Sequence, residues 1–235
     1  TRECGSVGPG QRYAQRLGSV EGLESGLVLA NAGSSNKVSN PFPFRAELQE
    51  TSRESEQLVS SNPATIVLEG AEATKTNLLS RWESVSSIYM ATHMLRDPQV
   101  PYLALIPLAS PPEADQPERS YLDITDIRSA DLRGCRLVVL SGCSSGAPYL
   151  KGTITGPSLG DAFLDAGARS VIFTFWDIPD REAARLMTVY IEKSANSDSS
   201  PTENLCRARR DIYLEAGKNG NGFGWASYAI KTAEL

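Results

Sequence analysis

The feature that most constrains the fold of this chain is a series of short apolar runs separated by polar stretches. The runs occupy residues 27–30, 65–68, 87–91, 102–106, 136–140 and 170–175. Strands that are covered on both faces have near-continuous apolar sequences, and several of these runs are separated by segments with helical patterns. The chain is therefore predicted to have an α/β fold in which helices cover a mostly parallel sheet.

Segments between the runs carry helix signals. Residues 45–60 are rich in Glu, Gln and Ser and predict an exposed helix, and residues 74–82 predict another. Apolar residues within 159–166 recur at i, i+3, i+4 and i+7, which predicts an amphipathic helix. Gly167 follows at the position where a helix often ends in the left-handed conformation.

The C-terminal third is predicted to hold two more helices and a last strand. Asp180 is expected to cap a helix that extends to about residue 193. The sequence Ser-Pro-Thr-Glu at 200–203 has the form of a capping box and predicts a helix that ends at Gly217. Residues 225–230 are predicted to form a closing strand, whereas the proline-rich and acidic segment 107–121 is predicted to be a surface loop.

Length and composition favour one large domain. The chain has 235 residues, of which 40% are hydrophobic and 22% charged, and this is enough apolar material for a full core. We expect residues 26–235 to form the domain. The glycine-rich residues 1–25 are expected to be a linker from a further N-terminal region, since the first residue is Thr.

Charge and hydropathy exclude several kinds of partner. The net charge is −5 and no cluster of Lys and Arg is interleaved with aromatic residues, so we expect no direct nucleic-acid binding. No apolar run approaches the roughly 20 residues of a membrane span, and no secretory leader opens the chain. A cytoplasmic protein without membrane contact is the expectation. The four cysteines are scattered without CxxC spacing, so disulfide and zinc sites are both weakly indicated.

His93, the single histidine, and Cys143 each follow an apolar run. Catalytic groups collect at the carboxyl ends of parallel strands, so the two residues are candidates for a catalytic pair. A cysteine nucleophile needs a base because the thiolate is its reactive form. The backbone N–H groups of Met94 and Cys143 would lie near the acyl oxygen and are candidates for an oxyanion hole. A buried cysteine and a histidine satisfied in the core are the alternative that these residues leave open.

The order of the two residues separates enzyme classes. Residues 142–146 also spell the GxSxG motif of α/β-hydrolases, but no histidine follows residue 93, and residues 147–158 contain prolines and glycines where a helix should start. The papain order, with the cysteine first, fails for the same reason. A histidine about 50 residues before the cysteine is the caspase arrangement.

The chain resembles the CHAT family of caspase-like cysteine peptidases. The resemblance rests on five motifs in order, which are Ala-Thr-His at 91–93, Leu-Val-Val-Leu-Ser-Gly-Cys at 137–143, the segment 159–175, Trp-Asp-Ile-Pro-Asp at 176–180 and Trp-Ala-Ser-Tyr at 225–228. It covers residues 26–235. It implies a caspase-like three-layer α/β/α sandwich, hydrolysis of peptide bonds without a cofactor, and a regulatory or sensor region on the N-terminal side or a separate activator.

The resemblance also implies a substrate pocket. Caspase-like enzymes line the pocket for the residue before the cleaved bond with the segment that follows the strand after the nucleophile, which makes Trp176, Asp177 and Asp180 candidates here. An acidic Asp177 is expected to select Lys or Arg. The alternative is that Asp177 and Asp180 only order the turn and cap the next helix.

Two positions depart from the family pattern. The family usually has Gly after the histidine and Ala before the cysteine, where this chain has Met94 and Gly142. A side chain at residue 94 is expected to crowd the cleft. We therefore expect a cysteine endopeptidase with a His93 and Cys143 dyad, gated by a partner or sensor. The alternative is a catalytically impaired module that binds peptide or protein partners.

Overall fold

A mixed, mostly parallel sheet forms the centre of the molecule. The computed structural model describes residues 25–32, 48–96, 104–110, 121–146, 149–151, 154–219 and 223–233. Within these residues the largest sheet has six strands in the order β11-β10-β7-β3-β1-β2. The strands are β1 (Gly26–Ala30), β2 (Ile66–Glu69), β3 (Ser87–Ala91), β7 (Leu137–Ser141), β10 (Ser170–Thr174) and β11 (Tyr228–Thr232). All neighbours pair in parallel except β10 and β11.

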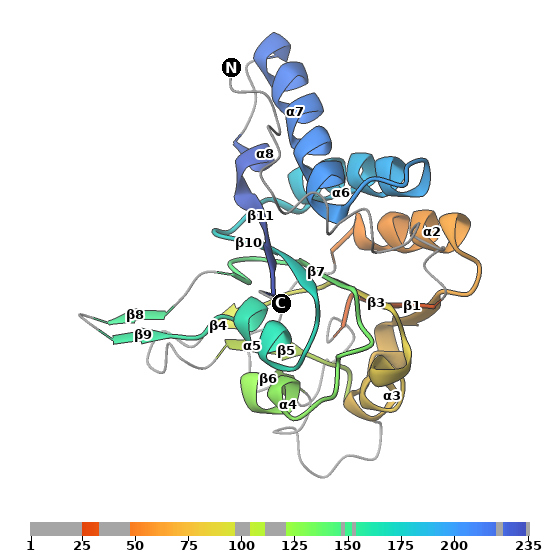
Figure 1. The fold of residues 1–235 in the computed structure, drawn as a ribbon, viewed down its shortest axis with the longest axis vertical. Coiled ribbons are helices and arrows are strands. Elements are labelled where there is room, and N and C mark those ends of the chain that lie inside the picture. Colours follow the sequence, from red (N-terminus) through yellow and green to blue (C-terminus); the bar gives the residue numbers. More distant parts are fainter. Residues whose placement is uncertain are drawn as a thin grey trace.

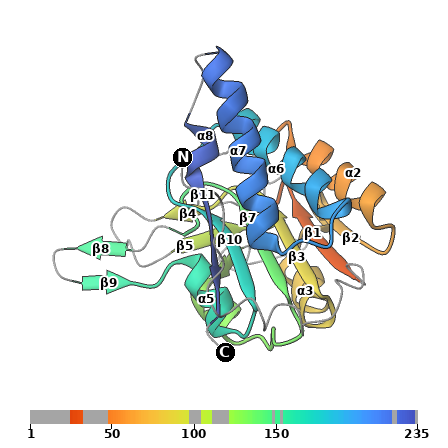
Figure 2. The same cartoon turned by 45° about the horizontal axis from the view of Figure 1, so that its top comes forward.

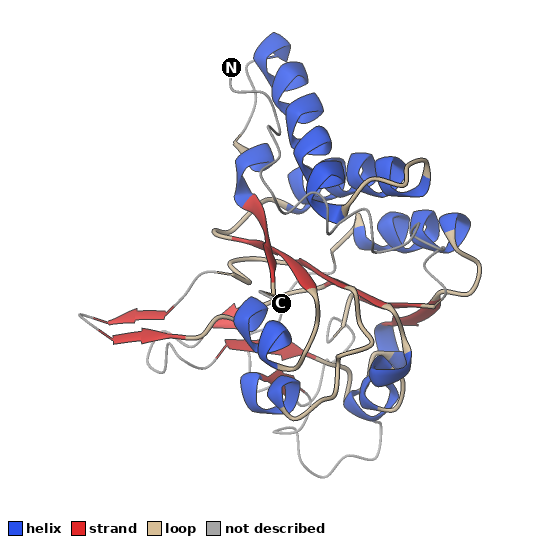
Figure 3. Ribbon diagram, in the orientation of Figure 1, coloured by secondary structure: helices blue, strands red, loops and turns tan. Residues whose placement is uncertain are grey.

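Helices cover both faces of this sheet, as Figures 1 and 2 show from two sides. One layer holds α2 (Thr51–Ser61), α6 (Asp180–Ala195) and α7 (Pro201–Asn219), and the other holds α3 (Lys75–Leu79), α4 (Ile124–Arg128) and α5 (Leu159–Asp165). Each layer buries its own hydrophobic cluster against the sheet. The cluster under α2, α6 and α7 includes Met187 and Tyr228, and the cluster under α3, α4 and α5 includes Phe163 and Trp82. The predicted α/β fold is therefore confirmed, and Figure 3 shows the strands between two sets of helices.

Smaller elements surround the central sheet. They are the 3₁₀ turns η1 (Gly70–Glu72) and η2 (Trp82–Ser84), the short helix α8 (Gly224–Ser227), and the strands β4 (Leu95–Arg96), β5 (Ala104–Pro107), β6 (Tyr121–Asp123), β8 (Tyr149–Lys151) and β9 (Ile154–Gly156). Strands β4, β5 and β6 form a separate small sheet. Strands β8 and β9 form a hairpin that projects from the body in Figure 1. None of the helices in the described residues is long and apolar enough to cross a membrane.

Several local predictions are confirmed by backbone geometry. Gly167 has a φ of 105° directly after α5, as a left-handed helix end requires. At the start of α7 the backbone N–H of Ser200 donates to Glu203 Oε2 at 3.0 Å, and that of Glu203 donates to Ser200 Oγ at 3.3 Å. These reciprocal bonds are those of a capping box. The strands predicted at 27–30, 65–68, 87–91, 136–140 and 170–175 correspond to β1, β2, β3, β7 and β10.

Other predictions are wrong in their details. The helix predicted at 45–60 begins at Thr51 among the described residues, and its face toward the sheet is buried rather than exposed. The helix predicted at 74–82 splits into α3 and η2. Asp180 is the first residue of α6 and not its cap. The cap position is held by Pro179, and no side chain makes a capping hydrogen bond there.

The C-terminal strand also differs from its prediction. Trp225 lies in α8, and the strand begins only at Tyr228 and runs antiparallel to β10. The run at 102–106 forms β5 in the small sheet rather than joining the central one. The predicted surface loop 107–121 lies mostly outside the described residues, but Leu108 and Ala109 at its start are buried.

Candidate active site

The pairing of β3 with β7 brings His93 and Cys143 to one edge of the sheet. These parallel strands pair in register up to Ala91 and Ser141. His93 and Cys143 are each the second residue beyond that pair, on strands about 4.8 Å apart. Both side chains are partly exposed. The structure thus brings together the two residues that the sequence singled out, at the end of the sheet where loops converge.

A tight turn formed by residues 142–146 carries Cys143. Its thiol lies 3.9 Å from the carbonyl oxygen of Ile178, toward which it donates. Ser144, the next residue, has a φ of 51°, which is uncommon for a residue with a side chain. Such strained positions persist only where the surrounding structure fixes them, and they cluster at functional sites.

Ser145 and Thr174 fix this turn to the end of β10. The backbone N–H of Thr174 donates to Ser145 Oγ at 2.9 Å, and Ser145 Oγ donates to the carbonyl of Leu140 at 3.3 Å. The Thr174 hydroxyl donates to the carbonyl of Gly142, and the N–H of Gly146 donates to the Thr174 carbonyl at 2.9 Å. Both hydroxyl side chains are buried. Sequence reasoning missed them, because a Ser or Thr at a strand end carries no signal of its partner.

Close packing explains both glycines of the Gly-Cys-Ser-Ser-Gly sequence. A Cβ atom on Gly146 would lie 1.7 Å from Cδ2 of Phe173, and a Cβ atom on Gly142 would lie 2.5 Å from the carbonyl oxygen of Thr92. Neither position tolerates a side chain without displacement of its neighbours. Among the described residues, the first helix after the turn is α5, which begins at Leu159. The structure therefore supports the rejection of an α/β-hydrolase elbow.

The Met94 side chain packs into the core rather than into the cleft. It is 7% exposed and belongs to the hydrophobic cluster on the α3, α4 and α5 side of the sheet. Its Cγ atom would be 2.8 Å from a Cβ atom on Gly142. The expected crowding of the cleft by Met94 is not observed.

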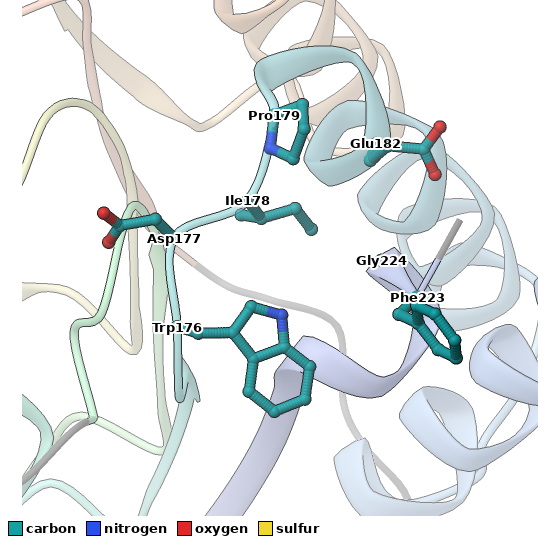
Figure 4. A pocket seen from close by; sticks show the side chains of 7 residues that line it. All are labelled: Trp176, Asp177, Ile178, Pro179, Glu182, Phe223 and Gly224. Atoms are coloured by element: carbon teal, nitrogen blue, oxygen red, sulfur yellow. The ribbon is translucent and has the colours of Figure 1, made fainter. Parts of the chain in front are cut away.

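A cavity of about 390 Å³ lies against the segment that follows β10. Its lining consists of Trp176, Asp177, Ile178, Pro179, Glu182, Phe223 and Gly224 (Figure 4). The carbonyl of Ile178 faces the Cys143 thiol, so Cys143 and the cavity share Ile178 as a neighbour. Trp176 and Phe223 are 43% and 79% exposed. Exposed aromatic side chains around a hollow are typical of binding surfaces.

The acidic residues divide between the cavity and its surroundings. In Figure 4 the side chain of Asp177 points away from the cavity, and its Oδ1 accepts a hydrogen bond from Ser144 Oγ at 2.7 Å. Asp180 is not part of the lining, and its Oδ2 accepts from the N–H of Glu50 at 3.2 Å. Glu182, which sequence reasoning missed, lines the cavity near Gly224.

The described residues contain no cluster of three His, Cys, Asp or Glu side chains that could hold a metal ion. Cys135, the other free cysteine among the described residues, is 2% exposed. Burial raises the pKa of its thiol to about 11. Cys135 is therefore an inert core residue, in contrast to the partly exposed Cys143.

Several solved structures have a similar fold, and one of them is an Arg-specific cysteine proteinase. The separase chain in the separase–securin complex of Saccharomyces cerevisiae has a TM-score of 0.60 and 14% identity, over 95% of this chain and 13% of that one. The Arg-specific cysteine proteinase gingipain R has a TM-score of 0.52 and 14% identity, over 89% and 46%. The complex of pro- and mature domains of Porphyromonas gingivalis RgpB has a TM-score of 0.55 and 12% identity, over 89% and 47%.

These likenesses show the fold and confirm the predicted caspase-like α/β/α sandwich. The chain spans less than half of the length of each of these proteins. No curated protein matches the sequence. The family model described as the CHAT domain matches residues 6–232.

Proposed function

Because the chain belongs to the CHAT-domain family, we propose that it is a cysteine endopeptidase with His93 as general base and Cys143 as nucleophile. The observation that carries the proposal is the in-register pairing of β3 and β7, which ends two residues before each of these side chains. The caspase-like fold shared with separase and gingipain R supports a protease-like module.

The proposed reaction uses the pair twice. His93 takes the thiol proton, and the Cys143 thiolate attacks the peptide carbonyl carbon. The backbone N–H groups of Met94 and Cys143 are proposed to stabilise the negative oxygen of the tetrahedral intermediate. The C–N bond breaks as the His93 imidazolium protonates the leaving amine, and water then hydrolyses the thioester.

The cavity beside Cys143 is the proposed binding site for the side chain before the cleaved bond. Trp176 supplies an apolar wall for a long aliphatic stem, and Glu182 supplies a carboxylate for a cationic end. Asp177 is engaged by Ser144 and is proposed to order the turn next to the nucleophile. We therefore propose a substrate with Lys or Arg at this position. Gingipain R, which has a similar fold, is Arg-specific.

Control by a protein partner is part of the proposal. Residues 26–235 are proposed to be the peptidase domain, and residues 1–25 are proposed to link it to a regulatory or sensor region. A separate activator is the alternative source of control. Separase, which has a similar fold, was solved in complex with securin. A cytoplasmic location remains a prediction.

Cleavage of a peptide library by wild-type protein and three variants tests the function. We expect Cys143→Ala and His93→Ala to abolish turnover, with Lys or Arg before the cleaved bond in the products. Cys135→Ala is the matched control, because this thiol is buried and inert. Equal turnover by wild type and Cys143→Ala would rule out the assignment.

A non-catalytic peptide-binding module is the second candidate. The observation in its favour is the exposed aromatic pair Trp176 and Phe223 around the cavity. Tight binding of basic peptides without product, in the presence of an activator, would favour this candidate. Detection of an acyl-enzyme at Cys143 would exclude it.

A further inference from the structure

Helix α2 turns an ionisable side chain toward the sheet. Its buried residues are Thr51, Glu54 and Ser55, all of them polar. The hydroxyl groups of Thr51 and Ser55 are satisfied locally, by the carbonyl oxygens of Leu48 and Thr51. Glu54 is 1% exposed and is the one acidic or basic residue of the described chain that is buried to this degree. Burial of a carboxyl group is costly unless its partners are specific, so the partners of Glu54 are informative.

The polar groups around Glu54 come from three strands. The Tyr89 hydroxyl on β3 donates to Glu54 Oε2 at 2.5 Å. Ser141, at the end of β7, lies close enough to lower the pKa of Glu54. Ser141 Oγ and the Tyr228 hydroxyl on β11 lie 2.9 Å apart, with either atom able to donate. A buried chain of polar groups therefore extends from α2 across three strands of the sheet.

This chain lies directly behind the candidate pair. Tyr89 is on the strand that leads into His93, and Ser141 is followed by Gly142 and Cys143. Burial is the largest cause of the raised pKa of the Tyr228 hydroxyl, and Glu54 and Cys143 raise it further. The polar chain therefore contacts both strands that carry the pair and ends near the nucleophile.

The groups around Glu54 are acidic or neutral. Asp180 at the start of α6 and Glu50 just before α2 both raise its pKa, whereas Tyr89 and Ser141 lower it. Glu69, on β2, accepts a hydrogen bond from Ser52 of α2 at 2.6 Å. No cation contributes to the pKa of Glu54. Burial is the largest cause, and the pKa rises to about 7.

We propose that Glu54 is a positioning residue for the nucleophile: its carboxyl group binds Tyr89 on β3 and lies beside Ser141 at the end of β7, and it thereby orders the ends of the two strands that lead to His93 and Cys143. The proposal rests on the proposed function in one respect, which is that His93 and Cys143 act as the catalytic pair. Glu54 touches no substrate and acts through the ends of β3 and β7.

The ionisation of Glu54 changes the direction of the hydrogen bonds. An ionised carboxylate only accepts, so Tyr89 donates to it. A protonated carboxyl carries a donor of its own, so the hydroxyl protons of Tyr89, Ser141 and Tyr228 must reorient around it. The polarity of the groups behind Cys143 thus depends on the charge of a residue on a helix outside the sheet.

The rate of Cys143 alkylation by iodoacetamide, followed by mass spectrometry of the labelled peptide across about pH 5.5 to 8.5, tests this proposal. His93→Ala serves as the background, because it removes the proposed general base and leaves any remaining pH dependence to other groups. In this background we expect an inflection near the pKa of Glu54. It should be lost in His93→Ala/Glu54→Gln and retained in His93→Ala/Glu56→Gln, where Glu56 is an exposed residue of the same helix.

Superimposable profiles for His93→Ala with and without Glu54→Gln would overturn the proposal. Tyr89→Phe in the same background is a second variant, which keeps the ring and removes the hydroxyl that lowers the pKa of Glu54. We expect it to move the inflection to higher pH, and an unmoved inflection would also contradict the proposal. Circular dichroism at each pH establishes that the variants are folded.

Failure of this proposal and failure of the proposed function give different results. Alkylation measures the reactivity of a thiol and requires no peptide hydrolysis. A protein that cleaves no peptide can still show the Glu54-dependent inflection, and an active peptidase can lack it.

Discussion

Met94 occupies the space that a side chain on Gly142 would need. The Cγ and Cε atoms of Met94 lie 2.8 and 3.1 Å from the position of a Cβ atom on Gly142. The family pattern implied by the resemblance has the small residue after the histidine and the larger one before the cysteine. In this chain the larger residue, Met94, follows the histidine, and the smaller one, Gly142, precedes the cysteine. The two residues lie just beyond the adjacent strands β3 and β7, so one departure from the family pattern compensates for the other.

The compensation predicts coupled effects on stability. Gly142→Ala should destabilise the fold by about 1–3 kcal/mol, because the added methyl group meets Met94 and the carbonyl of Thr92. Met94→Gly in the same chain should recover part of that loss, with a coupling energy on the order of 1 kcal/mol. Urea unfolding of the single and double variants measures the cycle. Strictly additive effects would show that the two residues do not share the space.

Gly146 should be still less tolerant. A Cβ atom there would lie 1.7 Å from Cδ2 and 2.4 Å from Cε2 of the Phe173 ring. Gly146→Ala should therefore cost about 3 kcal/mol or more, or prevent folding, because Phe173 is 1% exposed and has no room to move. Gly134→Ala is the matched control, since nothing lies within 4 Å of the added atom. Thermal unfolding of both variants makes the comparison, and equal melting temperatures would contradict the packing described.

Glu54 should make the fold less stable as pH rises toward neutrality. Its pKa is raised from 4.5 to about 7 in the folded chain, so the folded state binds a proton more tightly than the unfolded state. This contribution is fully present below about pH 4.5 and is lost as pH rises through about 7. The difference amounts to about 3 kcal/mol. Urea unfolding from pH 5 to 8 should show this slope in wild type and Glu56→Gln but not in Glu54→Gln. A slope that survives Glu54→Gln must come from another group.

The cavity predicts a separation of substrate binding from chemistry. For peptides with Lys or Arg, Trp176→Ala and Glu182→Gln should raise KM several-fold with little change in kcat, because both residues line the cavity away from the reacting atoms. Glu182→Gln should have no effect on peptides with a neutral residue at that position. Leu214→Ala, an exposed apolar residue of α7 outside the cavity, is the control. An unchanged KM in both cavity variants would remove the cavity from substrate recognition.

The elements that could be predicted from sequence are those whose signals are local. Apolar runs such as the one before Cys143 predict strands because burial on both faces demands them. The bonds between Ser200 and Glu203 follow from a three-residue spacing. The order of His93 and Cys143 sufficed to nominate the pair, because parallel strands present their carboxyl ends at one edge.

The features that escaped prediction depend on contacts between distant segments. Helix α2 reads as exposed because its composition is polar, yet Glu54 is buried against Tyr89, 35 residues further along the chain. Met94 reads as an obstruction until its packing against Gly142 is known. Asp180 has the residue type of a helix cap, but its carboxylate accepts from Glu50 instead. In each case the deciding partner is remote in sequence.

The register of β3 with β7 has a consequence for dynamics. His93 and Cys143 each lie two residues beyond a central, buried strand that is hydrogen-bonded to a neighbouring strand on each side. Such strands exchange their amide hydrogens only through large openings of the molecule, whereas exposed segments such as 175–177 exchange through small local ones. Moving the pair itself would therefore cost the activator proposed above much free energy. Reorganisation of the segment that carries Trp176 is the less costly way to switch the site on or off.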